Sequence, residues 1–467
     1  MGGEGYVTFN GIECVYVVGK DGIKLIPKNP DDIRKLNRYF DDRNFYFYYS
    51  DSVDKNQLAY IKKIEMNIGH SLNLIPLYSV KLLKKAPVSS LEMTGPAIDE
   101  FFSPAGYFYN KHISGDKTSV DLTRERELAD EWDIIVDKSK ISISLLYGGI
   151  LRRGIASDLI LHPTLHVDFP GTEDPNFYYK VYSILIRFLQ FVQYNGDLRR
   201  HKVYLRGTET NYTSGYLYDW SIQKQENSRF CTECEYQQFK PYIQKLLQFT
   251  ADNLNMSLAF LPTAQYRYDS SDYTPALLTT LFAAFENEYK INSKIYDLPN
   301  SNSINIDHIK SKVLKKISEC NTGELTETEK VFLRQVENRI NSLGIQTGQT
   351  RKIKNVYHIM EPAIKRSAEH LFIRSNLGTA DGFSEKEINQ IAGKIVALRS
   401  QAAHEHSILS FSDEQTEYIR FLEILIYAQM LKRAGIDDAG IELLIGVVFH
   451  CNFVFMEQKE KNKSSVF

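Results

Sequence analysis

The pattern of apolar residues changes near residue 270, and this change constrains the fold more than any other feature of the chain. Before it, short runs of β-branched and aromatic residues alternate with turn clusters, whereas after it the start signals of helices follow one another. In a strand, side chains on the same face recur every two residues, whereas in a helix they recur every three to four. We therefore predict an α+β fold, with a β-rich α+β region over 1–270, an all-α helical bundle over 271–456 and a charged, flexible tail over 457–467.

Several segments of the N-terminal region have a readable pattern. Runs typical of strands occur at 141–147, 159–162, 166–169 and 201–205. From 175 to 194, apolar residues recur every three to four positions, which predicts a helix packed on the sheet and ended by Gly196. In the first 130 residues, apolar residues recur with no clear two-residue or three- to four-residue spacing, so we assign no subdomains there.

Helices in the C-terminal region are marked by capping residues. A Ser or Thr side chain at the start of a helix accepts a free backbone N–H, and a Glu or Gln three residues later closes a capping box. Such starts lie at Thr274 before Pro275, and at 326–329, 384–387 and 412–415. Gly344 and Gly435 are suited to end two of these helices. Because each apolar helix face must be buried against a neighbour, the signals predict a bundle.

Composition limits the class of protein. A chain of 467 residues with 43% hydrophobic and 24% charged residues suits two or three folded, soluble domains. The formal net charge of -2 excludes a protein that coats nucleic acid through bulk attraction, so any such contact must come from local basic patches. No run of about 18 uncharged apolar residues occurs, and the start has no signal-peptide pattern. We expect a cytoplasmic protein with no membrane partner.

Cys231 and Cys234 have the spacing of a zinc-ligand pair. No second pair of this spacing and no H-x-x-x-H pair lies nearby, so a structural zinc would need distant ligands such as His201. Two ordinary thiols are the simpler interpretation, and we assign no metal. Glycine-rich phosphate loops, a G-x-S-x-G elbow and an H-E-x-x-H pair do not occur in the sequence either. We expect no cofactor.

Arg399 and His404 lie at the end of the helix that Ser384 begins. Residues five apart are separated by about 140° around an α-helix, so both can face one groove. An imidazole can take the proton of a ribose 2′-hydroxyl or protonate a leaving oxygen, and a guanidinium can hold a phosphate through two hydrogen bonds. This chemistry needs no metal. Taken alone, an R-x4-H match also arises by chance, and a structural role for both residues is the alternative.

The C-terminal region resembles the HEPN superfamily, and within it the ApeA-like HEPN family of bacterial defence against phages. The resemblance rests on the helix 391–404, on the apolar segment 421–426 with the helix end near 432–436, and on Phe285-Glu286 in the first helix. The segment 158–205 resembles the N-terminal domain that accompanies this family. The first 130 residues match only weakly.

This resemblance implies a function. In the superfamily an arginine and a histidine are the nuclease pair, which maps onto Arg399 and His404. It implies an endoribonuclease that leaves 2′,3′-cyclic phosphate and 5′-hydroxyl ends, with RNA as the substrate and tRNA as one candidate. It also implies a homodimer joined through the HEPN domain, a role in abortive infection, and a phage protein as trigger or inhibitor.

Other residues are candidates for support of the same site. Relatives carry Asn, Asp or His directly after the arginine, whereas Ser400 has a shorter reach. An acidic residue on an early helix often pairs with the arginine in the superfamily, and Glu286 and Glu288 are the candidates here. The alternative for each is an ordinary solvated helix charge. His406 either assists His404 or is a plain surface histidine.

Two basic clusters in the C-terminal region either hold an RNA backbone or form solvated helix faces. They are Lys310, Lys312, Lys315 and Lys316, and Arg351, Lys352 and Lys354. The alternative function is a non-catalytic HEPN module that binds nucleotide or RNA, or that only dimerises. Ser400 is the residue that favours this alternative.

Overall fold

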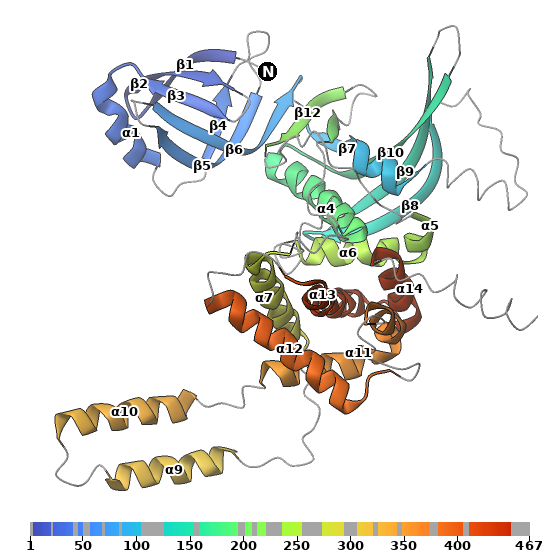
Figure 1. Cartoon of the computed structure of the whole chain (residues 1–467). Coiled ribbons are helices and arrows are strands. Elements are labelled where there is room, and N and C mark those ends of the chain that lie inside the picture. The colour runs from blue at the N-terminus through green and yellow to red at the C-terminus, as the bar shows by residue number, and fades with distance from the viewer. Residues whose placement is uncertain are drawn as a thin grey trace, which may run out of the picture. The chain divides into compact units, whose positions relative to one another are not determined.

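The computed structural model of the chain has two compact units, one built mainly from residues up to Tyr268 and the other mainly from Asp269 onward. The first combines a large sheet with helices and the second is helical, so the fold is α+β, as predicted (Figure 1). The structure describes residues 3–19, 22–40, 45–49, 57–67, 71–83, 86–103, 126–152, 158–194, 201–207, 213–220, 236–254, 273–293, 306–320, 326–342, 348–372, 382–404 and 411–449.

Twelve strands within the described part of the first unit form one antiparallel sheet. They are β1 (Gly3–Phe9), β2 (Ile12–Val18), β3 (Ile23–Pro27), β4 (Phe45–Tyr49), β5 (Gln57–Asn67), β6 (Ser71–Leu82), β7 (Val88–Thr94), β8 (Arg126–Val136), β9 (Ser139–Arg152), β10 (Asp158–Thr172), β11 (Lys202–Gly207) and β12 (Thr213–Asp219). The order is β1-β2-β3-β6-β12-β11-β7-β10-β9-β8, while β5 pairs with β4 and β6.

Strands β1 to β6 share a core with helix α1 (Ile33–Phe40), which follows the short turn η1 (Pro30–Asp32). Phe40 of α1 stacks on Phe45 at a ring distance of 4.5 Å and meets Phe9 edge-on at 4.8 Å. Asn10 and Gly11 both have positive φ, the two-residue turn that matches the twist of a hairpin, and they join β1 to β2. These elements lie in the part of the chain where the sequence shows no clean period.

The other half of the sheet is covered on one face by helices α2 (Pro96–Phe101), α4 (Pro175–Gln193), α5 (Tyr236–Phe239) and α6 (Ile243–Asp252), with η2 (Lys240–Tyr242) between the last two. Phe169 of β10 packs on Phe177 and Tyr178 of α4, and α6 packs on β8 and α4. The predicted helix over 175–194 is confirmed. Tyr194, in the left-handed conformation, caps it, and the predicted stop Gly196 lies outside the described residues.

The strand predictions need one correction. The runs 141–147 and 201–205 lie within β9 and β11, but 159–162 and 166–169 belong to one strand, β10, rather than to two. Pro163 does not break β10, because β7 pairs with β10 only from Leu165 onward. A proline is tolerated where the side of a strand that lacks its N–H is not paired.

The second unit contains α7 (Pro275–Ile291), α9 (Ile306–Cys320), α10 (Glu327–Ser342), α11 (Gln349–Leu371), α12 (Glu385–His404), α13 (Asp413–Arg433) and α14 (Asp438–Val448). Helices α7, α11, α12 and α13 pack on one another, and α9 packs on α10 (Figure 1). Every residue of α13 from Phe421 to Leu431 is buried, so this helix is the centre of the bundle. A helix that is buried all round must be surrounded by other helices.

The predicted helix starts are confirmed. The Thr274 hydroxyl accepts the Leu277 N–H at 3.2 Å. At the three capping boxes, the backbone N–H of the first residue donates to the side chain three residues on, at 2.8 Å for Thr326, 2.7 Å for Ser384 and 2.9 Å for Ser412. Each box satisfies N–H groups that a helix leaves free at its start.

The sequence predicts no membrane-spanning segment. Among the helices that the structure describes, none is both long and apolar enough to cross a membrane.

Candidate functional site

Arg399 reaches from α12 towards α7. Its side chain is half-buried, and Cζ lies 5.6 Å from the centre of the Phe282 ring, a distance at which cation and ring attract. Ser400 is exposed. His404 is the last residue of α12 that the structure describes. The His404 side chain, and all of His406, lie outside the described part of the structure.

Glu286 lies one turn after Phe282 on α7 and contacts side chains of a third helix, α11. The side-chain amide of Gln349 donates to its Oε1, and the Lys352 ammonium lies 3.3 Å from the same oxygen. Lys352 also lies 5.7 Å from the centre of the Tyr289 ring. Helices α7 and α11 therefore meet at this carboxylate.

The ionisation of Glu286 depends on these neighbours. Burial by itself raises its pKa, but the hydrogen bonds from Gln349 and Lys352, followed by the charges of Lys352 and Arg399, lower the pKa below its usual value. Glu286 is thus an ionised carboxylate within electrostatic reach of two cations. Of the two predicted acidic candidates, it is the one that the structure brings near Arg399.

Glu288 has a different partner, which corrects its prediction as a counter-ion of Arg399. Its side chain is 0% exposed and pairs with Arg433 of α13, whose Nε donates at 3.0 Å and Nη2 at 2.8 Å to the two carboxylate oxygens. Residues two apart on a helix point in directions about 200° apart, so Glu286 and Glu288 cannot face the same neighbour. Glu288 joins α7 to α13 inside the bundle.

The basic candidates are spread over two helices. Lys312 and Lys315 of α9 are exposed, Lys316 pairs with Glu319 at 2.8 Å, and the Lys310 side chain is outside the described residues. On α11, Lys354 lies 2.8 Å from Glu385, which also contacts His358 at 2.8 Å. Arg351 is exposed, and only Lys352 contacts the carboxylate near Arg399.

The structure does not test the predicted zinc-ligand pair. Cys231 and Cys234 lie outside the described part of the chain. Within that part, no three His, Cys, Asp or Glu side chains are grouped as metal ligands. His201, named as a distant ligand, is buried against Gly95, and burial lowers its pKa to about 4. It is a neutral core imidazole.

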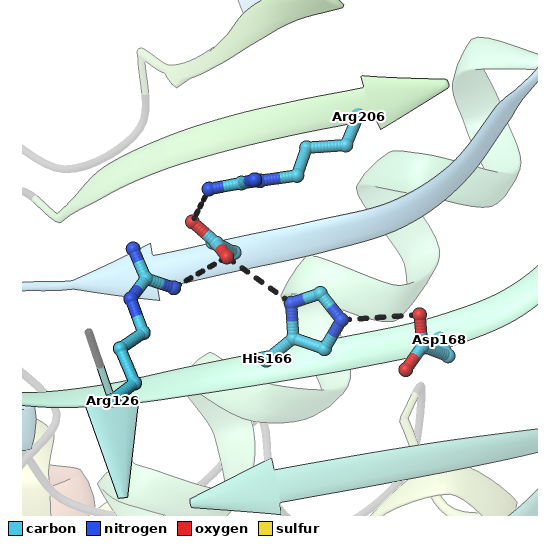
Figure 2. A network of polar contacts seen from close by, with 5 residues as sticks. Arg126, His166, Asp168 and Arg206 are labelled. Carbon is cyan, nitrogen blue, oxygen red and sulfur yellow. Dashed lines mark hydrogen bonds and ion pairs between the residues drawn. The ribbon is translucent and has the colours of Figure 1, made fainter. Parts of the chain in front are cut away.

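A second polar site, which no sequence motif marks, lies on the sheet face opposite the helices. It comprises Glu92 of β7, Arg126 of β8, His166 and Asp168 of β10, and Arg206 of β11, together called the Glu92 cluster (Figure 2). Arg126 Nη1 donates to Glu92 Oε1 at 2.5 Å and Arg206 Nη2 to Oε2 at 2.7 Å. The residue at the centre, Glu92, is only 5% exposed.

His166 lies between the two carboxylates of the cluster. Its Nδ1 is 3.3 Å from Glu92 Oε1, an ion-pair contact without the alignment of a hydrogen bond, and its Nε2 is 3.1 Å from Asp168 Oδ1. The Glu92 carboxylate, aided by Asp168, raises the pKa of His166 although burial opposes this. For Glu92, burial raises the pKa, but His166, Arg126 and Arg206 together lower it to about 2.

A β-bulge places Arg126 in this cluster. The pairing of β8 with β9 shifts by one residue between Leu128 and Asp130. After the shift Trp132 pairs with Ile143 on the helix-covered face, whereas before it Arg126 pairs with Gly148 on the other face. In a regular strand, residues separated by an even number share a face, so Arg126 would lie with Trp132. The bulge therefore turns the arginine to the polar face.

Comparisons with known proteins leave the family open. A scan against protein-family models and searches of curated proteins and of solved structures give no match to this chain.

We predict that Glu288→Gln destabilises the helical unit by about 3–5 kcal/mol, because it removes the charge of a carboxylate that is 0% exposed and pairs with Arg433, whose side chain is 15% exposed. The matched change Glu286→Gln, at a carboxylate 38% exposed, is expected to cost less than about 1 kcal/mol. Urea unfolding followed by far-UV circular dichroism measures both. Equal losses for the two variants would contradict the assigned roles.

We also predict that the Glu92 cluster contributes most to the stability of the β-rich unit between about pH 4.5 and 6.5, while the buried His201, whose pKa is lowered to about 4, makes the same unit less stable as the pH falls through this window. The pKa of Glu92 is lowered on folding, so its contribution is complete above the unfolded-state value and is lost as the pH falls toward 2. The pKa of His166 is raised, so its contribution is complete below the unfolded-state value and is lost as the pH rises through the folded one. Both tryptophans, Trp132 and Trp220, lie in this unit, so their fluorescence during urea unfolding reports its stability.

The control for this profile is a second histidine of the same strand. His166→Gln should flatten the alkaline limb, whereas His162→Gln, at a side chain 44% exposed, should leave it in place. An alkaline limb that survives in His166→Gln would show that another group causes it.

Proposed function

We propose that this chain is a HEPN-type, metal-independent endoribonuclease of anti-phage defence, in which Arg399 and His404 cut RNA. The observation that carries the proposal is the position of Arg399 on α12, the helix that also contains His404, with an ionised Glu286 and a second cation, Lys352, close by. A fixed guanidinium and a histidine on one helix can together catalyse the in-line attack of a ribose 2′-hydroxyl on the adjacent 3′-phosphate.

The reaction divides between the two side chains. A neutral His404 takes the proton of the 2′-hydroxyl, the freed oxygen attacks the adjacent phosphorus, and the bond to the 5′-oxygen breaks. The leaving 5′-oxygen takes up a proton from an imidazolium. Arg399 stabilises the negative charge that grows on the phosphate oxygens. The products are a 2′,3′-cyclic phosphate and a 5′-hydroxyl.

Glu286 is a positioning residue in this proposal. Through its charge it restrains Arg399, while the Phe282 ring supports the guanidinium from α7. A catalytic cation that is already held loses less conformational freedom when it binds the phosphate. Lys352, which shares the Glu286 carboxylate, is the basic candidate best placed to bind a neighbouring phosphate of the RNA.

The alternative is a non-catalytic HEPN module that binds nucleotide or RNA or that dimerises. The contact of Arg399 with Phe282 favours it, because a cation held on a ring can serve the bundle alone. The change Arg399→Lys separates the two functions. A structural cation tolerates lysine, whereas two-point binding of a phosphate needs the planar guanidinium.

Cleavage is expected to continue in EDTA and to fall by roughly 10²- to 10⁴-fold in His404→Ala, because proton transfer by a side chain contributes about that much. The assay follows end-labelled RNA, including tRNA, incubated with the full chain. Gln401→Ala, at an exposed side chain of the same helix, is the control that keeps the pair intact. Activity that is lost on chelation, or that is unchanged in His404→Ala, would refute the mechanism.

The active form is expected to be a homodimer with two copies of the Arg399 and His404 pair at one cleft. One histidine cannot be acceptor and donor at the same instant, and a two-fold contact supplies a second one. An excess of His404→Ala chains mixed with parent chains should therefore depress activity more than dilution does. A loss in simple proportion to dilution, together with a monomeric mass in light scattering, would exclude the shared cleft.

A further inference from the structure

We propose that the sheet face that carries Glu92 binds single-stranded RNA at β11 and β12, where the rings of Tyr204, Tyr216 and Tyr218 form a platform on which bases stack. These three residues are called the tyrosine row. The row belongs to the β-rich unit. The choice of RNA as the strand rests on the proposed function, whereas stacking on the row does not require that the helical unit cuts RNA.

The tyrosine row lies on the sheet face opposite the helices. Tyr204 of β11 pairs with Tyr216 of β12 and, on its other side, with Glu92 of β7. Residues that pair directly share a face, and so does Tyr218, two residues after Tyr216. The ring centres of Tyr204 and Tyr216 are 5.6 Å apart, and those of Tyr216 and Tyr218 are 6.5 Å apart with an interplanar angle of 28°. The rings therefore form a continuous row across two strands.

The tyrosine row is partly exposed, whereas the residues that alternate with it are not. Val203, Leu205 and Leu217 lie on the other face of β11 and β12 and are at most 3% exposed, while each tyrosine of the row is partly exposed. Cross-strand aromatic pairs stabilise a sheet by themselves, and an accessible row also offers π faces to a ligand. Substitution by phenylalanine and by leucine separates these two roles.

The two ends of the row differ. Trp220 follows Tyr218 by two residues, packs against the core that β1 to β6 share with α1, and donates its Nε1–H to the Ser79 hydroxyl at 3.0 Å. At the other end the row reaches Glu92, which is 5% exposed and paired with two arginines. A ligand on the row thus lies between an aromatic end and a polar one.

Cations flank the tyrosine row. Lys202, two residues before Tyr204 on the same face of β11, is exposed and forms no ion pair within the described part of the chain. Lys81 pairs with Tyr216 across β6 and β12, and Arg206 follows Tyr204 by two residues. Lys81 and Arg206 both have partners within the chain, so Lys202 is the cation assigned to a phosphate of the strand.

The carboxylates that the structure describes on this face of β7 to β12 are either buried or distant from the row. Glu92 lies beside Tyr204, but its charge is enclosed by its arginine partners. Asp168 of β10 lies two strands from β11, and Glu131 and Asp133 of β8 lie four strands away, about 10 Å and about 19 Å along a flat sheet. A phosphate backbone beside Lys202 therefore meets little repulsion.

Unpaired bases suit an aromatic row with a cation at its edge. Each base has a π face that stacks on an aromatic ring, and a positive charge beside the ring holds the backbone. In one common class of RNA-binding domain, aromatic residues on a sheet face stack two or three bases in this way. Bases in a duplex are already stacked on one another, so only a single strand offers their faces.

Fluorescence anisotropy of the full chain with a labelled 2′-O-methyl RNA oligomer of about ten uridines tests the proposal. The 2′-O-methyl groups remove the nucleophile, so binding is measured without cleavage, whatever the outcome for the proposed function. The single strand should bind, and the same strand annealed to its complement should bind more weakly. No binding of the single strand, equal binding of the duplex, or tighter binding of the matching DNA strand would overturn the proposal.

Variants localise the strand on the row. Tyr204→Leu and Tyr216→Leu should each weaken binding roughly 5- to 150-fold, the range for loss of one stack between a base and an aromatic ring. Tyr204→Phe and Tyr216→Phe keep the ring and should bind as the parent protein does. Tyr6→Leu, which removes a ring that is 78% exposed on β1, is the control. Parent-like binding by both leucine variants, or equal losses in the leucine and phenylalanine variants, would contradict the platform.

The assigned cation has its own test. Lys202→Gln should weaken binding and reduce the slope of log affinity against log salt concentration by about 0.7, the value for one phosphate contact in a single strand. Lys180→Gln is the matched control, because Lys180 lies on α4, on the other face of the sheet, where it pairs with Asp137. An unchanged slope in Lys202→Gln would contradict the phosphate contact.

A measurement on the parent protein covers the case in which the leucine variants do not fold. Probe bases replaced by 5-bromouracil cross-link under ultraviolet light to aromatic side chains on which they stack, and mass spectrometry of peptides identifies the side chain. Cross-links to Tyr204 or Tyr216 are expected. A probe that binds but cross-links only within the helical unit would overturn the proposal and leave the proposed function intact.

Discussion

The helical unit depends on the burial of α13. Its residues from Phe421 to Leu431 are buried on all sides, so α7, α11 and α12 must pack around it. This packing brings Arg399 of α12 over Phe282 of α7 and places Glu286 within reach of Arg399. The ion pair of the buried Glu288 with Arg433 joins α7 to α13 and helps to fix the helix from which Glu286 projects. The burial of the apolar side chains of α13 thus positions the polar side chains of the candidate site.

The β-rich unit follows a different principle. Its sheet buries one face under helices and leaves polar side chains on the other, as antiparallel sheets can. The position of each side chain depends on strand register, and one extra residue in β8 decides that Arg126 joins Glu92 instead of the core. A carboxylate that is 5% exposed, two arginines and a histidine are then confined to one small area of this face.

Local signals in the sequence predict local structure well here. The capping boxes at Ser384 and Ser412 involve groups three residues apart, so the sequence contains all the information they need. The approach of Glu286 to Arg399 depends on three helices packed together, and the sequence leaves the choice between Glu286 and Glu288 open. The Glu92 cluster depends on pairing between distant strands and on a bulge, for which no short motif exists. Helix α11 is also not predicted from the sequence, because Pro362 lies inside it and a proline normally interrupts a helix.

The central claim is that Arg399 and His404 transfer a phosphate from one ribose oxygen to another without a metal. The chemistry of the RNA ends tests this most directly, because it records the mechanism independently of the rate. RNA recovered after incubation with the full chain should carry 2′,3′-cyclic phosphate and 5′-hydroxyl ends, identified by mass spectrometry of the fragments. Fragments with 3′-hydroxyl and 5′-phosphate ends would contradict the claim, since attack by water, not by the neighbouring 2′-hydroxyl, produces them.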